Sequence, residues 1–254
     1  MQLELNLPNR QPWAFQDQMV GDIAEPVARY LADHAPWPAM VGWSWQQDHW
    51  VLAGDSQNAF TALATALRHG GLLGTWRNEL VKVFSSMGTP LGSIERATVL
   101  VLGLQTRAVH LVAQSSDGGW WMQQRAFNKP ANPGKWDSTV SGLMSASEEP
   151  EQTLLREAAE EAGLQPEHIA AREFVGEYFL EAPTFDQGLH GRMRETAMVW
   201  QVVLPHGVLP VNQDGEVAQF SLWSTEHLQR QLHAPHQLTP DAKVIYTDLL
   251  NQRA

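Results

Sequence analysis

The feature that most constrains the fold of this chain is the segment GLMSASEEPEQTLLREAAEEAGL, which begins at Gly142. Proline is common in the first turn of a helix and glycine just past its last residue, so Pro150 and Gly163 predict a helix between them. The apolar residues of that helix recur at helical spacing, as Leu155, Ala158 and Ala162. We therefore expect a helix that packs on a core, preceded by an irregular loop.

The same helix carries three carboxylates close together. At 100° per residue, Glu160 lies about 60° from Glu157 on one side and Glu161 about 40° on the other. We expect all three side chains to point away from the apolar stripe, with Arg156 bridging to Glu160 one turn on. A solvated helix face is one interpretation. A divalent-metal site is the other, because carboxylates this close repel one another and Mg²⁺ prefers oxygen ligands.

The composition limits which partners the chain can have. Its net charge of −11 and pI near 5.3 offer no basic surface to nucleic acid, so phosphate groups must be bound locally. The absence of cysteine excludes disulfides and thiolate nucleophiles. The N-terminal residues lack a signal-peptide pattern, and no apolar run reaches the length of a membrane span. We expect a cytoplasmic protein that binds neither nucleic acid nor membrane; its oligomeric state stays open.

The pattern of residues changes near Glu95, where we place a domain boundary. Residues 1–94 predict a small α+β domain, mostly helical with a few strands, and residues 95–254 predict an α/β domain with a helical tail. The expected helices are 22–35, 55–71, the carboxylate helix and the tail from 225. The expected strands are 49–54, 97–104, 107–114, 120–126, 173–182, 196–205 and 216–224, with a loop at 127–138.

The carboxylate segment resembles a complete Nudix box, because Gly142, Glu148 and the run REAAEEAGL stand at the spacing of that motif. The resemblance implies an α/β/α sandwich with a mixed sheet. It also implies hydrolysis of a diphosphate with bound Mg²⁺ or Mn²⁺. By position, the implied metal ligands are Gly142 (through its carbonyl), Glu157, Glu160 and Glu161. Arg156 would orient the carboxylates and Glu148 would brace the loop, so that Arg156, Glu157 and Glu161 are the expected catalytic residues. The general base stays open between Glu157, Glu195 and Glu216.

The loop before the box gathers basic residues in the sequence RAFNKPANPGKWDSTVSG. Arg125 and Lys129 are expected to bind the diphosphate, since a diphosphate needs donors beyond the metal; for Lys135 a surface role is as plausible. The loop is similar to one in isopentenyl-diphosphate isomerases, which have the Nudix fold. Those enzymes use an active-site cysteine and have a degenerate box, whereas this chain has no cysteine and an intact box.

A resemblance to one two-domain Nudix group covers nearly the whole chain. It rests on TWRNELVKV, GLQTRAVHL, the basic loop and PVNQDGEVAQFSLW. Members are related to thiamin pyrophosphokinase-associated proteins, which implies conversion of thiamin diphosphate, or its oxo or oxy forms, to the monophosphate. The chain departs from the group at Leu143, Ser147 and Trp136–Ser138, and Trp136 is expected to touch the substrate. Alternatives are a nucleoside diphosphate substrate such as ADP-ribose or NADH, an isomerase, or a non-catalytic sensor.

Overall fold

The structure is a computed structural model that describes residues 9–129, 131–186 and 189–252. The chain divides into two compact units. One comprises the residues up to Thr106 together with Glu181–Glu195, and the other comprises Arg107–Leu180 and the residues from Thr196 on. The domain boundary that the sequence indicates between residues 94 and 95 stays a prediction.

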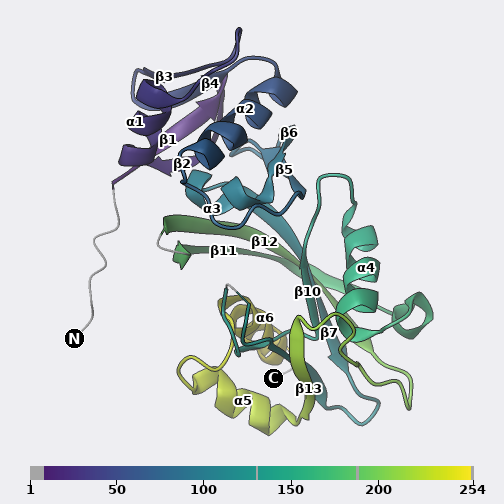
Figure 1. The fold of residues 1–254 in the computed structure, drawn as a ribbon. Coiled ribbons are helices and arrows are strands. Elements are labelled where there is room, and N and C mark those ends of the chain that lie inside the picture. Colours follow the sequence, from purple (N-terminus) through teal and green to yellow (C-terminus); the bar gives the residue numbers. More distant parts are fainter. Residues whose placement is uncertain (1–8, 130, 187–188, 253–254) are drawn as a thin grey trace. The chain divides into compact units, whose positions relative to one another are not determined.

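The first unit contains a four-stranded sheet in the order β2-β1-β4-β3 and a separate β5–β6 hairpin. In Figure 1 its first segment runs from purple to teal, and Glu181–Glu195 is green. The strands are β1 (Arg10–Phe15), β2 (Gln18–Ala24), β3 (Gly42–Gln46), β4 (His49–Ala53), β5 (Leu80–Phe84) and β6 (Pro90–Glu95). The helices are α1 (Glu25–His34), α2 (Ser56–His69) and the single turn α3 (Val99–Leu102), which follows the 3₁₀ turn Arg96–Thr98.

Three predictions for this region are wrong. Strands outnumber helices within residues 9–95, so the region is not mostly helical. The helix expected from Asp22 begins at Glu25, because Asp22 lies at the end of β2. Residues 97–104 form helical turns and not a strand, although they are rich in β-branched residues. The Glu95 carboxylate accepts a hydrogen bond from the Ala97 N–H, and Gly103 at φ 57° ends the last turn.

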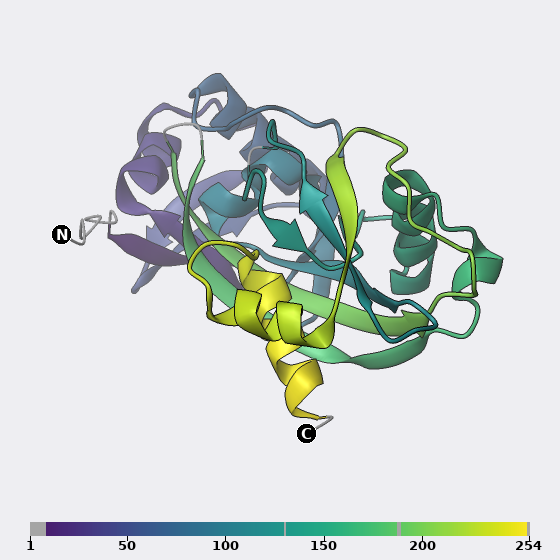
Figure 2. The same cartoon turned by 90° about the horizontal axis from the view of Figure 1, so that it is seen from below.

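The second unit is built on a seven-stranded sheet with the central order β11-β12-β7-β8-β13. Its strands are β7 (Gln105–Gln114), β8 (Trp120–Arg125), β9 (Trp136–Asp137), β10 (Val140–Leu143), β11 (Glu173–Asp186), β12 (Leu189–Val203) and β13 (Val217–Trp223). Its helices are α4 (Pro150–Ala162), α5 (Thr225–His233) and α6 (Pro240–Asn251), with a 3₁₀ turn at Pro166–Ile169. Figure 2 shows α4 on one side of the strands and α5 and α6 on the other. The predicted α/β class is therefore confirmed.

The sheet divides between β7 and β8. These strands pair only where Ala113 and Gln114 meet Trp121 and Trp120. Farther along, β7 pairs with β10, while β8 pairs with β9 on one edge and β13 on the other. Several buried polar side chains lie near this division. They are His110 on β7, Gln123 on β8, Asp137 on β9, and Ser138 and Thr139 between β9 and β10. Polar groups are costly to bury, so this part of the fold is where a binding site is expected.

Within the described part of the chain, no helix is both long enough and apolar enough to cross a membrane. The cytoplasmic location expected from the sequence stays a prediction.

Candidate active site

Helix α4 carries the predicted carboxylates, and both of its ends are capped. The Glu149 side chain and Gln152 form a capping box at its start, with Pro150 in the first turn. Gly163 ends the helix at φ 65°, in the left-handed region that glycine adopts without strain. The helix packs on the core through Leu154, Ala158 and Ala162, whereas Leu155, expected in the stripe, is only partly buried.

Arg156 joins the loop before the helix to the helix carboxylates. Its Nε donates to Glu148 Oε1 at 2.7 Å and its Nη2 to Glu148 Oε2 at 2.9 Å. Its Nη1 lies 2.9 Å from Glu157 Oε1 and donates to Glu160 Oε2 at 2.8 Å. Glu148 also accepts from the Thr153 hydroxyl at 2.9 Å. The Arg156 guanidinium lowers the pKa of Glu148, so this carboxylate stays ionised and holds the loop against α4.

The three helix carboxylates lie in different surroundings. The Glu160 side chain is 53% exposed and that of Glu157 is 15% exposed, whereas Glu161 is buried at 4%. The expectation that all three point away from the buried face is therefore wrong for Glu161. This residue lies over β10, where its Oε2 accepts from the Ser141 N–H at 3.0 Å.

Burial makes two of these carboxylates weak acids. It raises the pKa of Glu157 to about 7 despite the nearby Arg156, and the charges of Glu160 and Glu216 add to the increase. It raises the pKa of Glu161 to about 8, only partly offset by the Ser141 N–H. A cation bound beside them would restore their ionised forms.

Gly142 lies directly beneath Glu157. A Cβ atom on Gly142 would approach Glu157 Cγ, Cδ and Oε1 well inside 3.0 Å, closer than real Cβ atoms come. Only glycine therefore leaves the Glu157 carboxylate in its observed place. This is a structural requirement for Gly142 that is separate from the predicted role of its carbonyl.

The basic residues of the preceding loop reach the same region. Lys129 pairs with Glu216, and Arg125 Nη1 lies 3.5 Å from Asp137 Oδ2. The charge of Lys129 partly offsets the effect of burial on the pKa of Glu161. Lys135 instead donates to Asn132 within its own loop at 2.9 Å.

Trp136 and Glu195 are the remaining predicted residues. Trp136 is half-buried and packs on Trp223, with ring centroids 4.9 Å apart. Successive side chains on a strand point to opposite faces, so Trp136 points away from the face of β9 that carries Asp137. Glu195, one candidate base, belongs to the first unit, whereas Glu216 belongs to the unit that contains the box.

The structure adds residues that could not be found from the sequence alone. Gln123 and Ser141 both contact Glu161, and Asp137 contacts Arg125. In the sequence Gln123 is one of two adjacent glutamines in a strand, and only the pairing of the strands distinguishes it from Gln124.

The donor set fits a hard cation, although the side chains are not yet arranged around one. Among the described residues no three histidine, aspartate or glutamate side chains stand where they could hold a metal ion together. The reason is that Arg156 contacts Glu157 and Glu160, while Glu161 is bonded to the Ser141 N–H. The atoms that could hold Mg²⁺ or Mn²⁺ are the three carboxylates and the Gly142 carbonyl, all oxygen donors.

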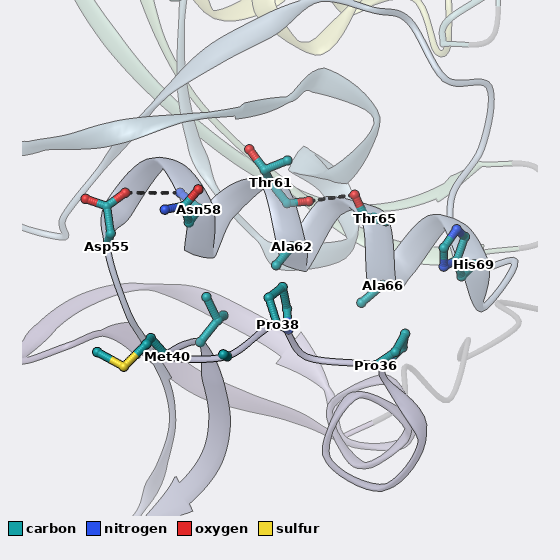
Figure 3. A pocket seen from close by; sticks show the side chains of 12 residues that line it. Pro36, Pro38, Met40, Asp55, Asn58, Thr61, Ala62, Thr65, Ala66 and His69 are labelled. Carbon is teal, nitrogen blue, oxygen red and sulfur yellow. Dashed lines mark hydrogen bonds between the residues drawn. The ribbon is translucent and has the colours of Figure 1, made fainter.

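A separate pocket lies in the first unit, between α2 and the loop before β3 (Figure 3). Its volume is about 620 Å³, and its lining includes Pro38, Met40, Ala62 and His69. It contains none of the predicted site residues.

Comparisons with known proteins agree with the box. The family model of the NUDIX domain matches residues 104–249. Nudix hydrolase 24, chloroplastic, of Arabidopsis thaliana is 27% identical over 221 residues, which is 83% of this chain and 59% of the relative. An uncharacterized Nudix hydrolase of Pseudomonas aeruginosa is 31% identical over 105 residues, 41% of this chain and 60% of the relative.

A solved structure supports the same fold. A Deinococcus radiodurans protein aligns with a TM-score of 0.50 at 20% identity, covering 66% of this chain and 96% of its own. This chain spans less than two thirds of the two relatives named above, so what the whole relatives do is not transferred to it. The family model itself covers more than half of the chain, and the chain therefore belongs to the NUDIX domain family.

Proposed function

We propose that this protein is a metal-dependent hydrolase of a small-molecule diphosphate. The observation that carries the proposal is the placement of Glu157, Glu160 and Glu161 on one helix, in the same unit as Arg125 and Lys129, whose side chains pair with Asp137 and Glu216. Acidic oxygens for a cation and basic groups for phosphate oxygens are what diphosphate hydrolysis requires.

The bound Mg²⁺ or Mn²⁺ would neutralise the diphosphate and lower the pKa of a water. Arg125 and Lys129 would bind the phosphate oxygens, exchanging their contacts with Asp137 and Glu216 for contacts with the substrate. Arg156 would keep Glu160 and the Glu148 loop in place.

The proton of the attacking water needs an acceptor. Glu157 and Glu216 are the two candidates in this unit, and the pKa of Glu157, about 7 before a cation binds, is in the range that suits a general base. Water would form a bond to phosphorus as the bond to the leaving phosphate breaks, giving a monophosphate and phosphate.

For the substrate we propose thiamin diphosphate or its oxo or oxy analogues. The support is the resemblance of TWRNELVKV and PVNQDGEVAQFSLW, outside the box, to the two-domain thiamin-associated group. The test is release of phosphate from a panel of diphosphates with Mg²⁺ or Mn²⁺, containing thiamin diphosphate, its analogues, ADP-ribose, NADH and isopentenyl diphosphate. For thiamin diphosphate, its analogues and isopentenyl diphosphate, pyrophosphatase would be added so that cleavage at either bond is detected. For ADP-ribose and NADH, which are cleaved into two monophosphates, alkaline phosphatase would be added to release phosphate from the products.

Preference for the thiamin compounds would support both parts of the proposal. Preference for a nucleotide would retain the reaction and remove the substrate. No turnover of any compound would contradict the hydrolase and favour a sensor. Glu160→Gln should abolish turnover while the melting temperature stays close to that of the wild type, because Glu160 is half exposed. Full activity of this variant would contradict the metal assignment.

A further inference from the structure

A buried glutamine contacts the carboxylate helix from the sheet. Gln123 on β8 is 1% exposed, and its Nε2 lies 3.3 Å from Ser141 Oγ and 3.5 Å from Glu161 Oε2. The adjacent Gln124 alternates to the other face of β8, where its Nε2 donates to the Gly134 carbonyl at 2.9 Å. The chain thus contains two neighbouring glutamines, of which only one faces the site.

The orientation of the Gln123 amide follows from its partners. Glu161 Oε2 already accepts from the Ser141 N–H at 3.0 Å, so it is an acceptor and requires a donor from Gln123. The amide therefore presents its NH₂ group to Glu161. Its carbonyl oxygen, Gln123 Oε1, is left buried and has no hydrogen-bond partner among the described residues.

A buried acceptor without a partner is unusual, since it loses its hydrogen bonds to water on folding. Such an atom beside a metal site has a natural partner, because Mg²⁺ usually keeps several of its waters when it binds to protein. These waters donate hydrogen bonds to acceptors around the site, and groups in this outer layer orient the ligands themselves.

We propose that Gln123 is a positioning residue of the metal site, holding Glu161 through its NH₂ group and accepting a hydrogen bond from a cation-bound water through Oε1. The proposal rests on the proposed function, since it needs a cation at the α4 carboxylates. It is independent of the substrate and of the general base.

The experiment measures Mn²⁺ binding to the full chain by electron paramagnetic resonance of the free ion. Gln123→Met removes both polar groups at nearly constant volume, and Gln123→Asn keeps a buried amide but withdraws it by one methylene. Gln124→Met is the matched control on the other face of the strand. We expect Gln123→Met and Gln123→Asn to weaken Mn²⁺ binding roughly tenfold, and Gln124→Met to bind as the wild type does.

A second readout separates positioning from a merely structural role. Phosphate release by the Gln123 variants, measured against Mn²⁺ concentration, should recover toward the wild-type rate when the ion is saturating. Unchanged Mn²⁺ affinity in both variants would overturn the proposal, as would a rate that saturating Mn²⁺ does not restore. If the wild type itself binds no Mn²⁺, the proposed function fails together with this inference. Normal wild-type binding with unaffected variants removes the role of Gln123 alone.

Discussion

Replacement of Gly142 by alanine tests whether the position of Glu157 matters for function. Alanine suits a strand at least as well as glycine, and Gly142 does not have a left-handed backbone conformation, so the backbone itself accepts the change. The added Cβ nevertheless overlaps the Glu157 carboxylate. Ordinary van der Waals contact begins at 3.4 Å, so the carboxylate must move by about 1 Å.

The expected cost falls on catalysis more than on stability. A displacement of about 1 Å in a catalytic group lowers rates roughly 100-fold, and this is the loss that we expect in kcat/KM. The displaced carboxylate can turn toward solvent, so the free energy of unfolding should fall by no more than about 1–2 kcal/mol. The Gly142 carbonyl remains in the variant, and any loss therefore comes from the added methyl group.

The assay compares phosphate release and thermal unfolding of Gly142→Ala with those of Gly176→Ala. Gly176 lies in β11 of the same unit, and a Cβ there meets nothing within 4 Å. The control should keep wild-type activity. Wild-type kcat/KM in Gly142→Ala would refute the reasoning, because it would mean that Glu157 moves freely or is not needed. Unfolding of Gly142→Ala with retention of fold in Gly176→Ala would show that the overlap is not relieved by the side chain.

Three further predictions concern charge. Lys129→Met should raise KM and lower kcat/KM roughly 30-fold, because a charge-assisted contact to phosphate is worth about 2 kcal/mol. The control Lys135→Met should change kcat/KM little, because the Lys135 amine is bonded within its own loop. Equal losses in the two variants would contradict the assignment of Lys129 to phosphate binding. Glu148→Gln removes the ion pair with Arg156 and should lower the free energy of unfolding in urea titrations by roughly 1 kcal/mol, a modest loss because the pair is partly exposed. An unchanged urea midpoint would show that the ion pair does not hold the loop against α4. In EDTA the folded protein binds protons at Glu157 and Glu161 more tightly than the unfolded chain does, because their pKa values are about 7 and 8 in the fold and 4.5 in the unfolded reference. The stability that these two groups contribute is therefore fully present below pH 4.5 and is lost as pH rises through about 7 to 8. Melting temperatures should fall from pH 5 to pH 8, and less steeply in Glu161→Gln; a rise would contradict the increases in pKa.

Features set by local interactions could be predicted from the sequence. The limits of α4 follow from Pro150 and Gly163, which act within one turn of the chain. The strand predicted at 97–104 is wrong, because its β-branched residues favour a strand whereas capping by Glu95 and the conformation of Gly103 make it helical. Here the capping interactions at the two ends outweigh propensity.

Features set by distant contacts could not be predicted in this way. Glu161 is buried because β10 lies beneath that side of α4, and helical spacing alone cannot show which neighbours cover a residue. Gln123 gains its contact with Glu161 only when β8, β10 and α4 come together. The identity of the carboxylates was therefore accessible from sequence, but not their surroundings.

The membership of Glu181–Glu195 in the first unit has a practical consequence for shortening the chain. The family match begins at residue 104, which suggests a cut just before it. Such a cut would remove Asp22, the ion-pair partner of Arg192, and Leu100, whose side chain lies against Gly191. The excised fragment would carry Glu181–Glu195 without these neighbours, and β-strands exposed in this way promote aggregation. If a fragment starting at residue 104 is insoluble, the cause would be the loss of these contacts, and shortening Glu181–Glu195 in the fragment should restore solubility.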